Sequence, residues 1–162
     1  GYLVLYKPED ETRLQEVMGQ QWDVVFNAEW TLARAQARLY TDDHDGFDNF
    51  NMGMALVELG EYERAIEAFA VAKEIGLPLR MLWYQFGPFE AYLGLERYDD
   101  VITRGREVLA YSPHVEEMYY YIARAYLAQG NLERAEANLE VATGRNPYYV
   151  DAMTLLDELR GE

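Results

Sequence analysis

The feature of the sequence that most constrains the fold is a helical hairpin at residues 116–147. Gly130 lies at its middle, where a left-handed conformation lets one helix end and the next begin. Pro147 closes the unit, because proline cannot continue a helix but can start another. Such a hairpin is apolar on two sides and must be covered by neighbours, which predicts a stacked array. Apolar residues recur at helical spacing in both halves: Tyr119, Ile122, Ala123 and Tyr126, then Leu132, Ala135, Leu139 and Ala142.

The same unit recurs in register elsewhere in the chain. Tyr62, Tyr98 and Leu132 occupy equivalent places at the start of second helices, with separations of 36 and 34 residues. The segments that carry them are GEYERAIEAF, ERYDDVITRG and GNLERAEANL. This pattern resembles the tetratricopeptide repeat, a helix–turn–helix with a period of 34 residues. The resemblance implies an all-α fold, a right-handed superhelix of stacked helical hairpins.

The N-terminal residues do not share the repeat pattern. Residues 1–8, GYLVLYKP, are rich in β-branched and aromatic residues and predict a short strand or extended segment. A lone strand has no partner within the chain. Two interpretations remain open: this segment is either a disordered tail or the last strand of a preceding domain.

The array is predicted to occupy residues 9–162. A divergent first repeat is expected at 9–43, with helices at 9–18 and 21–40. Regular repeats follow at 46–79, 80–113 and 114–147. A capping helix is expected at 148–160, and its inner stripe is predicted to consist of Val150, Met153, Leu156 and Leu159.

Four residues carry local expectations. Asp45, in the acidic loop 41–49, is expected to cap the following helix, since this loop does not match the ligand positions of a calcium-binding EF-hand. At Gly53, the resemblance to the tetratricopeptide repeat implies a close approach of the paired helices. Pro88 is expected to bend or bulge the helix that contains it. Gly105 leaves room for a large neighbouring side chain.

Composition excludes several classes of function. The net charge of −15 disfavours nucleic acid and anionic membranes as partners, because phosphate contacts need Lys and Arg. There are no cysteines, and the sequence has no run of eighteen apolar residues that would predict membrane insertion. The two histidines, His44 and His114, lie about seventy residues apart in expected loops, and no catalytic or phosphate-binding motif accompanies them. No enzymatic activity, metal or cofactor is therefore expected of this chain, and its compartment is not determined.

Binding of a protein or peptide is the predicted function. The resemblance implies that first helices line a concave groove, as in relatives that hold extended peptides. Arg124 is the sole cation among the groove positions, which disfavours a clamp for a terminal carboxylate. An aromatic groove suits an apolar or proline-containing segment, and a basic partner is a further option. The groove candidates are Phe47, Phe50, Met54, Tyr84, Pro88, Tyr92, Tyr120, Tyr121 and Arg124. Half of these side chains are expected to pack in the core instead of lining the groove. The alternative function is a structural scaffold or self-association module without a peptide ligand, and a homo-oligomer is compatible with either.

A second resemblance concerns the order of the segments. GYLVLYKPEDETRLQEVMG, followed by an array that contains MLWYQFGPFEAYLGLERYDDVI, resembles the C-terminal region of certain bacterial proteins. In these proteins a papain-like cysteine peptidase domain of the bacteriocin-processing type precedes tetratricopeptide repeats. The resemblance implies that residues 1–7 are the final strand of such a domain and that the chain is accessory to it. The catalytic Cys and His would then lie upstream, and none is assigned to a residue here.

Overall fold

Helices form every regular element that is described in the computed structural model of this chain, which covers residues 28–41, 44–77 and 86–161. The predicted strand at 1–8, the helix at 9–18 and the start of the next helix lie outside these residues. The described helices are α2 (Ala28–Arg38), α3 (Gly46–Glu58), α4 (Tyr62–Ile75), α6 (Gly87–Gly94), α7 (Tyr98–Tyr111), α8 (Glu116–Ala128), α9 (Leu132–Arg145) and α10 (Val150–Arg160). The prediction of an all-α fold is confirmed.

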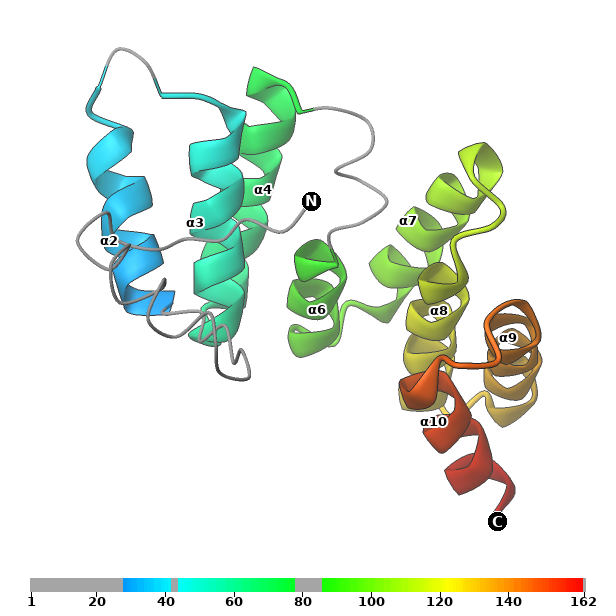
Figure 1. Ribbon diagram of the computed structural model, residues 1–162. Coiled ribbons are helices and arrows are strands. Elements are labelled where there is room, and N and C mark those ends of the chain that lie inside the picture. Colours follow the sequence, from blue (N-terminus) through cyan, green and yellow to red (C-terminus); the bar gives the residue numbers. More distant parts are fainter. Residues whose placement is uncertain (1–27, 42–43, 78–85, 162) are drawn as a thin grey trace, which may run out of the picture.

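Successive helices pair as antiparallel hairpins that stack into an array (Figure 1). The hairpins are α3/α4, α6/α7 and α8/α9. α2 packs on α3, α6 packs against both helices of the hairpin before it, α7 packs on α8, and α10 packs on α9. The first helices of successive hairpins are α3, α6 and α8, their second helices are α4, α7 and α9, and the hairpins follow one another across the view in chain order (Figure 1).

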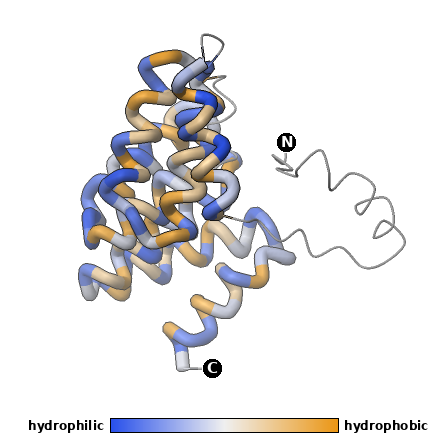
Figure 2. Tube along the Cα trace, turned by 90° about the vertical axis from the view of Figure 1, so that its left-hand side faces the viewer, coloured by the Kyte–Doolittle hydropathy of each residue, from blue (hydrophilic) through white to orange (hydrophobic). Residues whose placement is uncertain are grey.

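The hydrophobic core runs between these helices. Hydrophobic and hydrophilic residues alternate along each helix, as expected for helices with one buried face (Figure 2). Leu56, Val101, Met118 and Leu139 are almost fully buried and come from four different helices. At about 25 cal/mol per Å² of apolar surface, burial of such side chains against a neighbouring hairpin is the main source of stability.

Glycines allow close helix packing at two predicted places. A Cβ atom added to Gly53 would lie 2.5 Å from the Phe69 ring of the paired helix α4. A Cβ atom added to Gly105 in α7 would lie 2.8 Å from the Ile122 side chain of α8. Both distances are shorter than side-chain packing tolerates. The expected close approach at Gly53 and the expected large neighbour of Gly105 are confirmed.

The turns within the three hairpins differ at one position. Gly60 and Gly130 adopt positive φ angles of 74° and 75° in the first and third hairpins. Glu96 occupies the corresponding turn of the middle hairpin with φ 57°. A residue with a Cβ atom is disfavoured in this left-handed conformation by roughly 1 kcal/mol. The middle hairpin thus holds a strained turn that its neighbours avoid.

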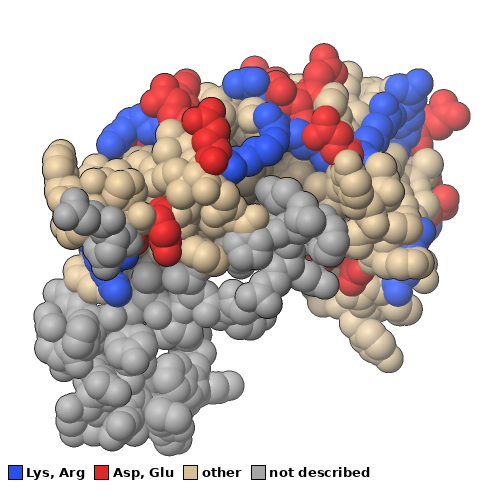
Figure 3. Space-filling view, turned by 90° about the horizontal axis from the view of Figure 1, so that it is seen from above, with Lys and Arg blue, Asp and Glu red and all other residues tan. Residues whose placement is uncertain are grey.

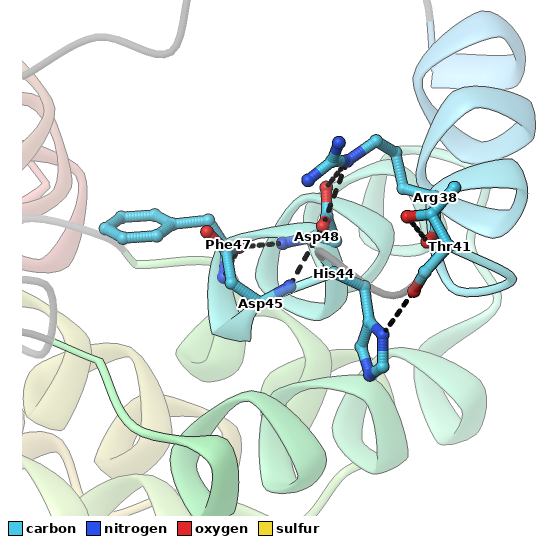
Figure 4. A network of polar contacts seen from close by, with 6 residues as sticks. All are labelled: Arg38, Thr41, His44, Asp45, Phe47 and Asp48. Carbon is cyan, nitrogen blue, oxygen red and sulfur yellow. Dashed lines mark hydrogen bonds and ion pairs between the residues drawn. The ribbon is translucent and has the colours of Figure 1, made fainter.

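The start of α3 is fixed by the predicted cap. Oδ1 of Asp45 accepts hydrogen bonds from the backbone N–H groups of Phe47 (2.9 Å) and Asp48 (3.2 Å), and the Asp48 side chain accepts one from the Asp45 N–H (3.1 Å). This reciprocal arrangement satisfies donors that a helix start leaves unpaired. Asp48 also accepts from Nε of Arg38, which ties α3 to the end of α2 (Figure 4). The capping role of Asp45 is confirmed.

Two expectations about helices are corrected by the structure. α6 begins at Gly87, so Pro88 lies in its first turn, where its missing N–H needs no partner, and not inside the helix as predicted. In α10, the predicted inner stripe is right for Leu156 and Leu159 but wrong for Val150 and Met153, which are exposed to 68% and 41%, whereas Ala152 is buried. The buried face of α10 consists of Ala152 and Leu156, with Leu155 and Leu159 packed beside them.

The surface of the described residues is rich in charge. On the face seen in Figure 3, acidic and basic side chains are interleaved along one edge rather than separated into blocks. Ion pairs also connect helices, as where Nε of Arg160 in α10 lies 2.7 Å from Glu136 of α9. No helix in this part of the chain is both long enough and apolar enough to cross a membrane.

Candidate functional site

One face of the array combines aromatic and charged side chains from α6, α8 and the start of α10. In α8, Glu117, Tyr120 and Arg124 are spaced three and four residues apart and therefore share a stripe. We call this surface the inner face. It consists of Phe86, Glu90, Glu117, Tyr120, Arg124, Tyr149 and Asp151.

A bidentate ion pair joins α6 to α8 across the inner face. Nη1 of Arg124 lies 2.5 Å from Oε1 of Glu90, and Nη2 lies 3.1 Å from Oε2. The Tyr121 hydroxyl donates to the same Oε1 at 2.8 Å. The side chains of Arg124 and Glu90 are only 31% and 36% exposed, so the ion pair is partly shielded from water. We call this pair the Glu90–Arg124 rung.

Burial and the rung together shift the pKa values of Tyr121 and Arg124. Burial raises the pKa of the Tyr121 phenol, and the Glu90 charge and hydrogen bond raise it further, so the hydroxyl remains a donor. Burial acts to lower the pKa of Arg124, but the hydrogen bond and charge of Glu90 outweigh it and the net change is upward. The Arg124 guanidinium is therefore permanently charged and already occupied by a carboxylate.

Aromatic rings surround the rung. The Tyr121 ring lies 5.4 Å from the rings of Phe86, which precedes α6, and Phe89 of α6, measured between centroids. On the other side, the Tyr120 ring lies 5.2 Å from that of Tyr149, with a tilt of 55°. Arg124 lies over the Tyr120 and Tyr121 rings, at 5.6 and 5.3 Å from their centroids. Tyr120 and Tyr149 are only half-buried, so this ring pair is available at the surface.

Two carboxylates flank the tyrosine pair. Burial is the main reason why the pKa of the Tyr149 phenol is raised, and the charges of Glu117 and Asp151 raise it further. Burial also raises the pKa of Glu117 itself. In the part of the chain that the structure describes, neither Glu117 nor Asp151 forms an ion pair. The inner face therefore carries an excess of negative charge beside exposed rings.

Comparison with known proteins defines the repeats. Residues 92–156 match a family model described as Tetratricopeptide repeat, and residues 49–75 match a second model with the same description. These two segments are tetratricopeptide repeats. No curated protein sequence matches the chain.

Solved structures agree with this assignment. The chain is similar to "MamA 41-end from Desulfovibrio magneticus RS-1", with 20% identity and a TM-score of 0.69, over 91% of this chain and 80% of that one. It is also similar to "MamA RS-1 ArsTM double mutant", with 22% identity and a TM-score of 0.68, over 82% of this chain and 73% of that one. At such identity the likeness shows the fold alone. The tetratricopeptide-repeat superhelix predicted from the sequence is thus confirmed.

The predicted groove residues fall into three groups. Phe50, Tyr92 and Tyr121 are at least nine-tenths buried and belong to the core between repeats. Tyr84 lies outside the described residues. The remaining candidates are partly exposed, and only Tyr120 and Arg124 lie on the inner face as defined here; the group consists of Phe47, Met54, Pro88, Tyr120 and Arg124.

Glu90, Tyr149 and Asp151 are among the residues of the inner face that were missed as groove candidates. Glu90 and Asp151 look like ordinary solvated acids on helices, and Tyr149 precedes the last helix. A signal was present for Glu90, which stands 34 residues before Arg124. Because a tetratricopeptide repeat places residues one period apart beside each other, opposite charges at that separation predict a rung. The same reasoning pairs Glu117 with Asp151, also 34 residues apart.

The histidines lie away from the inner face and from each other. Nδ1 of His44 lies 2.9 Å from the Thr41 carbonyl oxygen, and Nδ1 of His114 lies 3.1 Å from a guanidinium nitrogen of Arg145. No group of three or more His, Asp or Glu residues in the described ranges is placed to hold a metal ion. The titratable groups that do converge are those of the inner face, which are suited to binding.

Proposed function

We propose that this chain is a protein-interaction module that binds an extended segment of a partner protein along the inner face. The observation that carries the proposal is the half-exposed pair of Tyr120 and Tyr149, whose rings touch beside the Glu90–Arg124 rung. Aromatic side chains that are held by neighbours supply a large contact area at a small loss of conformational entropy.

The chemistry of the face favours apolar or proline-containing segments. A proline ring packs on an aromatic ring and enters the complex with little flexibility left to lose. Arg124 already holds the Glu90 carboxylate in a bidentate pair, so it is not available to clamp the terminal carboxylate of a ligand. The bound segment is therefore expected to be internal rather than a chain end.

Selection of random dodecapeptides on the immobilised chain tests this proposal. We expect enrichment of peptides with proline and apolar residues, and a loss of their binding in Tyr120→Ala and Tyr149→Ala. Tyr111→Ala is the matched control, because Tyr111 is 84% exposed at the end of α7. Failure to enrich any peptide, or binding that both inner-face variants retain, would contradict the proposal.

A second candidate function is self-association as a scaffold. Val150 and Met153 leave an exposed apolar strip on α10, next to Tyr148, which is 87% exposed. A strip at one end of an array can contact a different surface of another copy and generate open assemblies. Sedimentation velocity over a range of concentrations should then show assembly in the natural chain and not in Val150→Lys/Met153→Lys. A monomer at every concentration would exclude this candidate.

An accessory role beside a peptidase is a finer form of the first proposal. It is supported by the resemblance of the segment order to bacterial papain-like peptidase proteins that carry such repeats. In that arrangement the inner face would present a peptide to an upstream active site. A longer protein that cleaves peptides selected on this chain, and loses this with Tyr120→Ala, would support the role. Cleavage that is indifferent to Tyr120 would count against it.

A further inference from the structure

The charge of the inner face identifies one feature of the segment that it binds. The rings of Tyr120 and Tyr149 lie 5.2 Å apart between centroids, and the carboxylates of Glu117 and Asp151 are close enough to act on the Tyr149 phenol. Resting on the proposed function, we infer that Tyr120, Tyr149, Glu117 and Asp151 together recognise a cationic side chain, arginine or lysine, within that segment.

The first reason is that the cation already on this face is taken. The Arg124 guanidinium donates to both oxygens of Glu90 and lies over the Tyr120 ring at 5.6 Å. It neutralises Glu90 and leaves the carboxylates of Glu117 and Asp151 without a described cation. The inner face contains three acidic residues, Glu90, Glu117 and Asp151, and one basic residue, Arg124. Its net charge is therefore −2.

The second reason is the combination of rings and carboxylates. The electron-rich faces of tyrosine rings attract cations, and the attraction grows when the site is partly shielded from water. Carboxylates beside the rings add direct charge pairing and hydrogen-bond acceptors for a guanidinium or ammonium group. A neutral or acidic side chain would leave Glu117 half-buried and unpaired.

The third reason is that the chain itself shows this mode of contact nearby. Guanidinium groups lie over tyrosine rings at 4.8–5.6 Å from the ring centroids in several places. Among these are Arg124 over Tyr120, Arg97 and Arg104 over Tyr92, and Arg145 over Tyr119. At Tyr149 no such guanidinium is present among the described residues. A partner arginine or lysine would complete there the arrangement that the array uses internally.

The experiment compares dodecapeptide selections on three forms of the chain. One is the natural chain, one is Glu117→Gln/Asp151→Asn, and one is the control Glu63→Gln/Glu67→Gln. The control removes the same charge from exposed positions of α4, far from the inner face. Thermal unfolding of all three verifies that they are folded, and selections are performed at physiological salt so that long-range attraction is screened.

We expect the natural chain and the control to enrich peptides with one Arg or Lys at a fixed distance from the apolar or proline positions. The site variant should lose that basic position and keep the apolar ones. For the strongest peptide, replacing its basic residue by glutamine should weaken binding to the natural chain about tenfold and leave binding to the site variant unchanged. Tyr149→Leu should weaken binding to a similar extent.

Other outcomes would overturn the inference in distinguishable ways. Peptides that are enriched on the inner face without a basic position would refute the cation and leave the proposed function standing. An equal loss of basic peptides in the control would show attraction to the net charge of −15 rather than recognition at Tyr149. Failure of every form to enrich a peptide would refute the proposed function and the inference together.

Discussion

Two pairs of residues on the inner face obey the same spacing but differ in charge. Glu90 and Arg124 are one repeat period apart and form a bidentate rung between neighbouring hairpins. Glu117 and Asp151 are also one period apart, but both are acidic and both raise the pKa of the Tyr149 phenol beside them. The comparison teaches that the repeat period sets which positions are equivalent in neighbouring hairpins, while the residues at them decide whether an ion pair forms or charge is left for a partner.

The largest effect is expected from turning the rung into a second acidic pair. Arg124→Glu places a carboxylate against Glu90 and removes the guanidinium from the Tyr120 and Tyr121 rings. The free energy of unfolding should fall by roughly 3 kcal/mol in urea denaturation. Arg145→Glu, the same charge change at an exposed position of α9, should lower it by less than about 1 kcal/mol. Equal decreases in the free energy of unfolding in the two variants would show that the rung stabilises the fold no more than an exposed charge does.

A smaller loss is expected from removing one donor to the rung. Tyr121→Phe deletes the hydroxyl that donates to Glu90 at 2.8 Å, inside a nearly buried site. We expect a decrease in the free energy of unfolding of about 1 kcal/mol. Tyr120→Phe is the control, because the Tyr120 hydroxyl makes no hydrogen bond within the described residues, and it should change stability by less than about 0.5 kcal/mol. The comparison fails if Tyr120→Phe is the more damaging change.

The reverse exchange puts a cation on the acidic side of the inner face. Glu117→Lys places an ammonium group near Tyr149, where the Glu117 carboxylate acts now, and should abolish selection of basic peptides. Loss of an acid from the first turn of a helix is itself unfavourable, and Glu133→Lys in the first turn of α9 reproduces that loss. Glu117→Lys should therefore be more stable than Glu133→Lys by about 0.5 kcal/mol in urea denaturation. If Glu133→Lys is as stable, Glu117 carries no unpaired charge that a cation relieves.

The smallest effect is a pH dependence specific to Glu117. Burial raises the pKa of this carboxyl above its ordinary value of 4.5, so the folded chain holds the proton at a higher pH than the unfolded chain. The stabilisation from that proton is complete below the ordinary pKa and is lost as pH rises through the raised one. The free energy of unfolding of the natural chain, relative to Glu117→Gln, should decrease by up to about 0.5 kcal/mol between about pH 4 and pH 7. An increase over that range would contradict the burial of Glu117.

Much of the fold follows from local sequence signals. Asp45 was recognised as a cap because its side chain has acceptors and stands just before a helical pattern. Gly53 and Gly105 indicated close packing because the tetratricopeptide resemblance implies a close approach at the first and an aromatic residue in place of the second. The cap depends on one residue and its immediate neighbours, and the glycines on their place in the repeat, which is why these features could be predicted.

Errors arose where the phase of a helix mattered. Val150, Met153, Leu156 and Leu159 are spaced by three throughout, and each step of three residues falls about 60° short of a full turn. After the three steps from Val150 to Leu159, the side chain points to the opposite side of the helix, so these four residues cannot share one face. A stripe that alternates steps of three and four, such as the one through Ala152 and Leu156, stays against α9.

The candidate site was harder to predict than the fold. Phe50, Tyr92 and Tyr121 have the same residue types as a binding surface but are covered by the next repeat. Glu90 and Asp151 have the residue type of a solvated face but take part in the inner face. Residue type does not separate these cases, because exposure depends on which side chain lies one period away.

The strained turn at Glu96 has a consequence for how the molecule comes apart. A solenoid normally frays from its ends, where each unit has one neighbour fewer. Here the turn in the middle hairpin stores a backbone penalty that the turns at Gly60 and Gly130 do not have. The middle hairpin is therefore expected to open at a lower free energy than it would with glycine at this turn, which narrows the usual advantage of the centre over the ends.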